Sequence, residues 1–114
     1  MSTPEQLVQA QLEAYNRQDI EAFLACYHED CEFIDWPGKV RLHGHDEWRP
    51  RYLELWARSP HLQARILNRM VLGRHVVDLE QLEHHADGPR APLVVVYEAD
   101  GQRLRRVWVM SESS

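Results

Sequence analysis

The sequence contains little of what several large classes of protein require. No stretch approaches the roughly 20 apolar residues that a membrane-spanning helix needs, and the first residues lack the basic start and apolar run of a signal peptide. Basic residues are outnumbered, because 13 Lys and Arg stand against 18 Asp and Glu and the net charge is −5. That charge has the wrong sign for binding a phosphate backbone. We therefore expect a cytoplasmic protein with neither a nucleic acid nor a membrane as partner.

Residues typical of metal and cofactor sites are also scarce or badly spaced. Cys26 and Cys31 are too few for a disulfide framework, and a second cysteine pair for zinc is missing. The histidines at 43, 45, 84 and 85 have no further Cys or carboxylate at a recognised ligand interval. The sequence has no serine nucleophile elbow and no glycine-rich phosphate loop. It therefore predicts neither a metal ion nor a cofactor.

The chain has 114 residues, of which 44% are apolar, and this composition predicts one globular domain over residues 1–114. Thr3 and Gln6 have the spacing of a capping box around Pro4, which predicts the start of a first helix. Asp19 is the expected N-cap of a short second helix. Residues 45–59 follow helical spacing again and predict a third helix.

The rest of the sequence favours strands. A strand is expected at residues 32–36, ended by the turn-forming pair Pro37 and Gly38, with a short return strand at 40–43. After Pro60 the apolar period changes from helical spacing to two. This pattern predicts four longer strands, at residues 62–72, 75–83, 93–98 and 104–110. The expected architecture is α+β, with three helices packed on one face of a mainly antiparallel sheet.

Two amides and three arginines break these patterns. Gln11 lies within the apolar stripe of the first helix, and Asn68 lies within the apolar row of the strand at 62–72. Each amide either faces a ligand in an apolar cavity or is a buried amide bonded to protein groups. Strict alternation would divide Arg103, Arg105 and Arg106 between the two sheet faces, which favours a surface or dimer-interface role.

The element order and the stretches at residues 8–19, 33–38 and 105–110 resemble the SnoaL-like and ketosteroid-isomerase-like branch of the nuclear transport factor 2-like superfamily. The resemblance covers nearly the whole chain. It implies a cone-shaped, cystatin-like fold in which a curved sheet wraps a long helix around a pocket. It also implies a homodimer joined through the outer face of the sheet.

The resemblance also assigns positions to a site. Asp35 falls where ketosteroid isomerases keep an aspartate general base, although a turn-capping aspartate would fit the Pro37 turn equally well. The isomerases also keep a phenol side chain and a second carboxylic acid in their site. The resemblance places the phenol at Gln11 and the second acid near Val94. Aromatic residues would line the pocket or fill the core, namely Tyr15, Trp36, Tyr52, Trp56 and Trp108.

Two functions follow from these observations. The first is a hydrophobic pocket for a planar or polycyclic organic molecule, with isomerase or other proton-transfer chemistry in which Asp35 is the base and Gln11 or Asn68 donates a hydrogen bond. The second is a non-catalytic module for ligand binding or dimerisation, because the oxyanion pair of the isomerases is missing. A second acid or strong donor facing Asp35 across the cavity would distinguish them.

Overall fold

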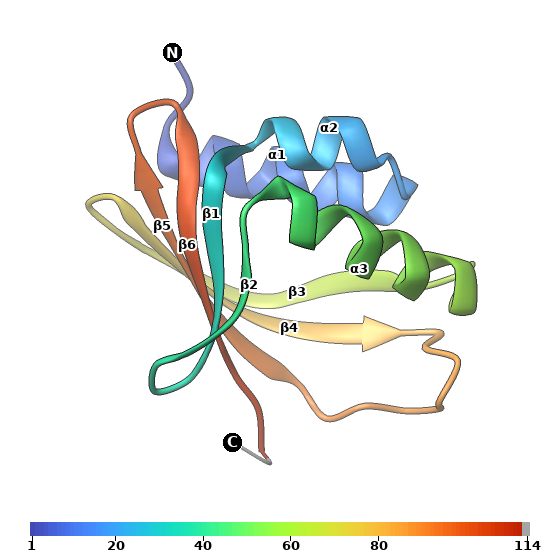
Figure 1. The fold of residues 1–114 in the computed structure, drawn as a ribbon. Coiled ribbons are helices and arrows are strands. Elements are labelled where there is room, and N and C mark those ends of the chain that lie inside the picture. Colours follow the sequence, from blue (N-terminus) through green and yellow to red (C-terminus); the bar gives the residue numbers. More distant parts are fainter. Residues whose placement is uncertain (113–114) are drawn as a thin grey trace.

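The computed structural model describes residues 1–112 as three helices and one six-stranded sheet (Figure 1). The helices are α1 (Pro4–Arg17), α2 (Ile20–Ala25) and α3 (His45–Arg58). The strands are β1 (Tyr27–Asp35), β2 (Lys39–His43), β3 (Gln63–Leu72), β4 (His75–Glu83), β5 (Leu93–Asp100) and β6 (Arg103–Met110). The expected element order is confirmed, and β1 starts five residues earlier than the alternation at 32–36 predicted.

Both predicted helix starts are confirmed. The Thr3 side chain accepts a hydrogen bond from the backbone N–H of Gln6 at 3.1 Å, and the Gln6 side chain accepts one from the backbone N–H of Thr3 at 2.9 Å. The Asp19 side chain accepts from the N–H of Ala22 at 3.1 Å. These side chains satisfy N–H groups that the first turn of a helix leaves without partners.

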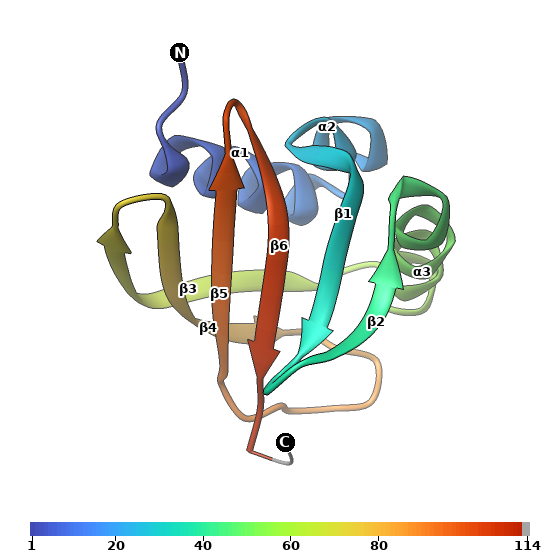
Figure 2. The ribbon, with the colours of Figure 1, turned by 60° about the vertical axis from the view of Figure 1, so that its left-hand side comes forward.

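The sheet is mixed, in the order β2-β1-β6-β5-β4-β3. β1 and β6 run parallel, and the other neighbouring pairs run antiparallel. The parallel pair arises because the last strand returns to the middle of the sheet, beside the first. All three helices lie on one face, and the twisted sheet curves around them (Figures 1 and 2).

A bulge in β3 overturns the expected single apolar row of that strand. Ile66 pairs with Glu80 and Asn68 pairs with Leu79, so Leu67 is the extra residue. An extra residue reverses which face the following side chains occupy. Asn68 is therefore exposed on the outer face instead of facing a cavity. Arg69 points inward in its place.

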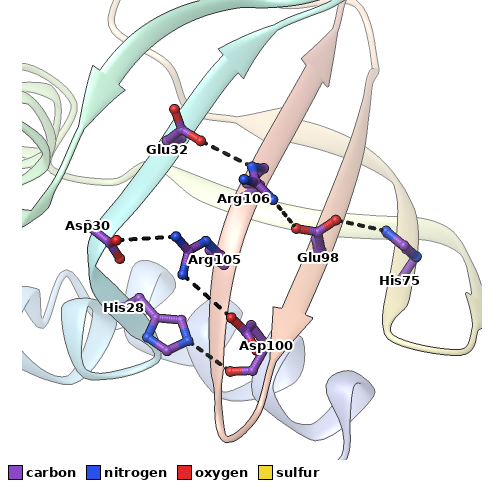
Figure 3. A network of polar contacts seen from close by, with 8 residues as sticks. All are labelled: His28, Asp30, Glu32, His75, Glu98, Asp100, Arg105 and Arg106. Carbon is purple, nitrogen blue, oxygen red and sulfur yellow. Dashed lines mark hydrogen bonds and ion pairs between the residues drawn. The ribbon is translucent and has the colours of Figure 1, made fainter.

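A second bulge, in β6, overturns the expected division of the arginines. Glu98 pairs with Arg106 while Ala99 pairs with Leu104, which makes Arg105 the extra residue. Arg105 and Arg106 consequently both reach acidic partners on the outer face (Figure 3).

The outer face carries a network of charged side chains from β1, β4, β5 and β6 (Figure 3). Arg106 donates to Glu32 at 3.1 Å and to Glu98 at 2.7 Å, and His75 lies 3.3 Å from the other Glu98 oxygen. Arg105 contacts two further carboxylates, those of Asp30 at 3.3 Å and Asp100 at 3.5 Å.

Beside this network, one apolar row crosses the whole outer face. Cross-strand pairing joins one residue of each strand, namely Met70, Val77, Val96, Trp108, Ile34 and Val40. Met70 is 61% exposed and Val40 is 47% exposed, whereas Ile34 is buried. We call these six residues the outer apolar row.

The core between the helices and the sheet is rich in aromatic rings. Trp48 is fully buried and stacks on Tyr52 with ring centroids 5.5 Å apart, and Phe23 lies 4.8 Å from Tyr52. Trp56 packs edge-on against Tyr15 at 5.7 Å. This cluster fixes the angle between α3 and the other helices, and so positions the side chains that face the sheet.

Candidate functional site

A cavity of about 570 Å³ opens between the helices and the concave face of the sheet. Its volume falls within the range of small-molecule sites, roughly 300 to 1,000 Å³. Apolar and aromatic side chains from α1, α2, α3 and all strands except β3 form most of the wall, including Leu12, Tyr15, Phe23, Phe33, Tyr52, Leu55, Leu93, Val95 and Val107. The cavity wall is therefore largely apolar and aromatic.

Four buried polar side chains gather on this wall: Gln11, Tyr27, Glu80 and Tyr97. We call them the inner polar group. The Tyr27 hydroxyl donates to Gln11 Oε1 at 3.0 Å, and Gln11 Nε2 donates to the Tyr97 hydroxyl at 3.2 Å and to the carbonyl of Val8 at 3.0 Å. The Gln11 amide is thus a buried amide bonded to protein groups, and it also borders the cavity.

Glu80 is the residue that the sequence analysis missed. It is 8% exposed, and burial raises its pKa to about 7, with the nearby Asp78 carboxylate adding to the effect. Arg69 and a hydrogen bond with Tyr97 act in the opposite direction. A signal was available, because Val76, Asp78, Glu80 and Leu82 occupy alternate positions of one strand and so share a face.

Asp78 shares this face with Glu80 but is fully paired. Both Asp78 oxygens accept from Arg69, at 2.7 and 2.9 Å, and Arg69 also donates to Gln9 of α1 at 3.0 Å. Asp78 is fully buried, so the ion pair lies in a region of weak screening. Because Arg69 neutralises Asp78, Glu80 is the carboxyl group of the concave face that has no ion-pair partner within residues 1–112.

Asp35, Arg41 and Arg51 form the rim of the cavity. Asp35 and Arg41 make an ion pair in which the Arg41 Nε group holds one carboxylate oxygen. Both side chains are partly open to solvent, at 35% and 54% exposure. The Arg51 side chain is exposed and makes no ion pair or hydrogen bond with any other residue of the described part of the chain. The rim therefore carries one excess positive charge.

The predicted pocket residues divide into two groups. Gln11, Tyr15, Asp35 and Tyr52 line the cavity. The others do not: Trp36, Trp56, Asn68 and Trp108. Trp56 is 4% exposed and belongs to the aromatic core, and Trp36 is 47% exposed. Trp108 lies in the outer apolar row, and Asn68 was moved outward by the β3 bulge.

Residues 1–112 contain no group of three His, Cys, Asp or Glu side chains close enough to hold a metal ion. Cys26 and Cys31 are buried free thiols. None of the helices in this part of the chain combines the length and apolar character needed to cross a membrane.

Solved structures with the same fold are numerous. An uncharacterised cystatin-fold protein from Novosphingobium aromaticivorans is 24% identical, with a TM-score of 0.86 over 96% of this chain and 98% of that one. A protein from Catenulispora acidiphila with a ketosteroid isomerase-like fold, in complex with trimethylamine, is 18% identical, with a TM-score of 0.75 over 95% and 85%. A candidate polyketide cyclase from Sinorhizobium meliloti is 16% identical, with a TM-score of 0.78 over 90% and 92%.

No functionally curated protein matches the sequence. At these identities the solved structures establish the fold, which is the cystatin-like fold of the nuclear transport factor 2-like proteins. The SnoaL-like domain family matches residues 8–110, nearly the whole chain. The expected resemblance is confirmed, and the protein belongs to the SnoaL-like domain family.

Proposed function

We propose that this protein binds a small planar organic molecule in its cavity and moves a proton between two of the molecule's atoms, as an isomerase or related proton-transfer enzyme does. The observation that carries the proposal is Glu80, a buried carboxyl group that borders the cavity beside Tyr97 and Gln11 and has no ion-pair partner among residues 1–112. Buried carboxyl groups of this kind are common among catalytic acids and bases.

The chemistry follows from the protonation state of Glu80. A group whose pKa is about 7 is present in both forms at neutral pH, so it can accept a proton and return it. The Glu80 carboxylate would remove a proton from a carbon next to a carbonyl. The electron pair of that C–H bond then forms the enolate, and protonated Glu80 delivers the proton to another carbon.

Tyr97 is the proposed hydrogen-bond donor in this step. Burial raises its pKa well above the ordinary value, so its hydroxyl stays protonated and able to donate. Gln11 donates to the Tyr97 oxygen and orients the ring hydroxyl. Once Glu80 is protonated, its carboxyl group no longer requires the hydrogen bond from Tyr97. The Tyr97 hydroxyl can then donate to the enolate oxygen instead.

Asp35 remains a second candidate for the base, because it occupies the position of the isomerase aspartate and borders the same cavity. Its carboxylate is held by Arg41 and would have to leave that ion pair to accept a proton. The proposal therefore assigns proton transfer to Glu80 first and a role at the rim to Asp35.

A non-catalytic binding module is the alternative function. It is favoured by the closed set of hydrogen bonds among Tyr27, Gln11 and Tyr97, which leaves these donors already committed to protein groups. In that case the cavity binds a ligand without changing it.

We also propose that two copies associate through their outer sheet faces. The outer apolar row leaves Met70 and Val40 exposed, and a two-fold axis would place the row of one copy on the row of another. The charged network around Arg106 would flank this contact (Figure 3). The two reduced thiols suit a reducing compartment, which supports placing the protein in the cytoplasm.

The proposed chemistry can be tested by hydrogen–deuterium exchange of 1-tetralone, a bicyclic ketone with acidic protons next to its carbonyl. Wild-type protein in D2O should speed deuterium uptake, followed by NMR, and Glu80→Gln should lower that rate at least tenfold. Glu83→Gln, on the same strand but away from the cavity, should retain it. If exchange is lost in Asp35→Asn but not in Glu80→Gln, the base is Asp35 and not Glu80. If the wild-type protein catalyses no exchange of this and similar ketones, the non-catalytic binding module is favoured.

A further inference from the structure

We propose that the ligand of this cavity is an organic acid, with its carboxylate held by Arg51 at the rim and its planar apolar body extending inward. This inference rests on the proposed binding of a small molecule in the cavity, and it adds the substrate class and a specificity residue. It does not depend on which residue transfers a proton, or on whether any does.

The charge of the rim is the first observation. Arg41 and Asp35 form an ion pair and cancel one another, whereas Arg51 borders the cavity with no partner among residues 1–112. The uncompensated charge is positive although the chain as a whole carries −5. A local positive charge in an acidic protein attracts an anion to that place and not to the surface in general.

The position of Arg51 is the second observation. Arg51 directly precedes Tyr52, which is partly buried, lines the cavity and stacks on Trp48. Burial strongly raises the pKa of the Tyr52 hydroxyl, and the nearby Arg51 charge has a small opposing effect. A guanidinium at this place can hold a carboxylate by two parallel hydrogen bonds while the rest of the ligand lies against the aromatic wall.

The wall and the inner polar group specify the remainder of the ligand. Tyr15, Phe23, Phe33 and Tyr52 present ring surface to the cavity, which suits a flat apolar body. The buried carboxyl group of Glu80 would repel a second negative charge, so the inward end of the ligand should be neutral, such as a ketone or hydroxyl group. The matching class is an aromatic or polycyclic acid with a neutral oxygen at the far end.

Binding of 2-naphthoate and its neutral analogue 2-naphthamide tests this inference. The two probes share one ring system and differ in the charge of the end group. Isothermal titration calorimetry at pH 7 should show that wild-type protein binds 2-naphthoate about tenfold more tightly than 2-naphthamide, the size expected of a charge-assisted hydrogen-bond pair.

Variants separate Arg51 from the rest of the cavity. Arg51→Gln should abolish the preference for 2-naphthoate and change 2-naphthamide binding little, and Arg51→Lys should keep part of the preference. Arg58→Gln is the matched control, because it removes the same charge from the same helix outside the cavity. Circular dichroism before titration would verify that each variant is folded.

The outcomes distinguish this inference from the proposed reaction. A preference for 2-naphthoate that persists in Glu80→Gln, whether or not 1-tetralone exchange is catalysed, supports an acid ligand. Equal binding of both probes to wild-type protein, or an equal loss of both in Arg51→Gln, would overturn the inference while leaving the reaction intact. Binding of neither probe would count against the acid ligand and against the cavity as a binding site.

Discussion

The hydroxyl of Tyr27 donates a hydrogen bond to the side-chain oxygen of Gln11 at 3.0 Å, and both residues are buried. Tyr27 begins β1 and Gln11 lies in the middle of α1, so this bond ties the long helix to the sheet. The other end of the Gln11 amide reaches Tyr97 of β5 at 3.2 Å. One amide therefore connects a helix with two strands at the wall of the cavity.

Replacing Gln11 should be costly because it leaves the buried Tyr27 hydroxyl without its acceptor and removes the hydrogen bond that the Tyr97 hydroxyl accepts. We expect Gln11→Leu to lower the free energy of unfolding by about 2 kcal/mol, measured by urea denaturation. Tyr27→Phe in the Gln11→Leu background should recover part of this loss, since it removes the Tyr27 hydroxyl that the first change leaves unpaired. Additive losses in the double variant would show that the two side chains are not coupled.

Glu80 should make stability depend on pH between about 4.5 and 7. Its pKa is raised from 4.5 to about 7 in the folded state, so protonation favours folding. The contribution of Glu80 to the free energy of unfolding is complete below pH 4.5 and is lost as the pH rises through 7. The loss is on the order of 3 kcal/mol. The unfolding free energies of wild type and Glu80→Gln should therefore be compared from pH 4.5 to 8. Wild type should lose stability relative to the variant as the pH rises.

The comparison for this pH effect is Glu83→Gln, which should keep the wild-type profile. Glu98 and Glu21 have lowered pKa values, so their contributions change below pH 4.5 and do not interfere. A wild-type profile that remains parallel to that of Glu80→Gln over the whole range would show that Glu80 has an ordinary pKa.

The outer apolar row predicts a dimer that one charge at its centre should disrupt. Val96 lies between Val77 and Trp108 in this row. We expect sedimentation of wild-type protein to give twice the monomer mass and that of Val96→Lys to give the monomer mass, because a buried unpaired charge opposes association. Gln63→Lys, exposed on the same sheet away from the row, should remain dimeric. A monomeric wild-type protein would contradict the proposed interface.

Local signals in the sequence were sufficient for most of the element boundaries. The capping box of Thr3 and Gln6, the cap of Asp19 and the period-two strands each act within a few residues, so they are readable without the fold. The resemblance to the SnoaL-like branch then predicted the curved sheet around a long helix. It also placed Asp35 and Gln11, both of which line the cavity.

The bulges were not readable in this way. Leu67 and Arg105 carry ordinary strand side chains, and only pairing with the neighbouring strands makes each of them an extra residue. Each bulge reversed the alternation beyond it, so Asn68 turned outward and Arg69 turned inward. A prediction from strict alternation therefore held up to each bulge and failed from the bulge onward.

The sequence by itself determined the element order, the helix starts and the family, because caps, turn residues and apolar periods act over short distances along the chain. Only the tertiary structure decided which polar groups share the cavity. Gln11 and Tyr97 are 86 positions apart, and Glu80 acquires its raised pKa from burial and from Asp78. Burial and long-range hydrogen bonds depend on the whole packed fold, so the inner polar group exists only once helices and sheet have met.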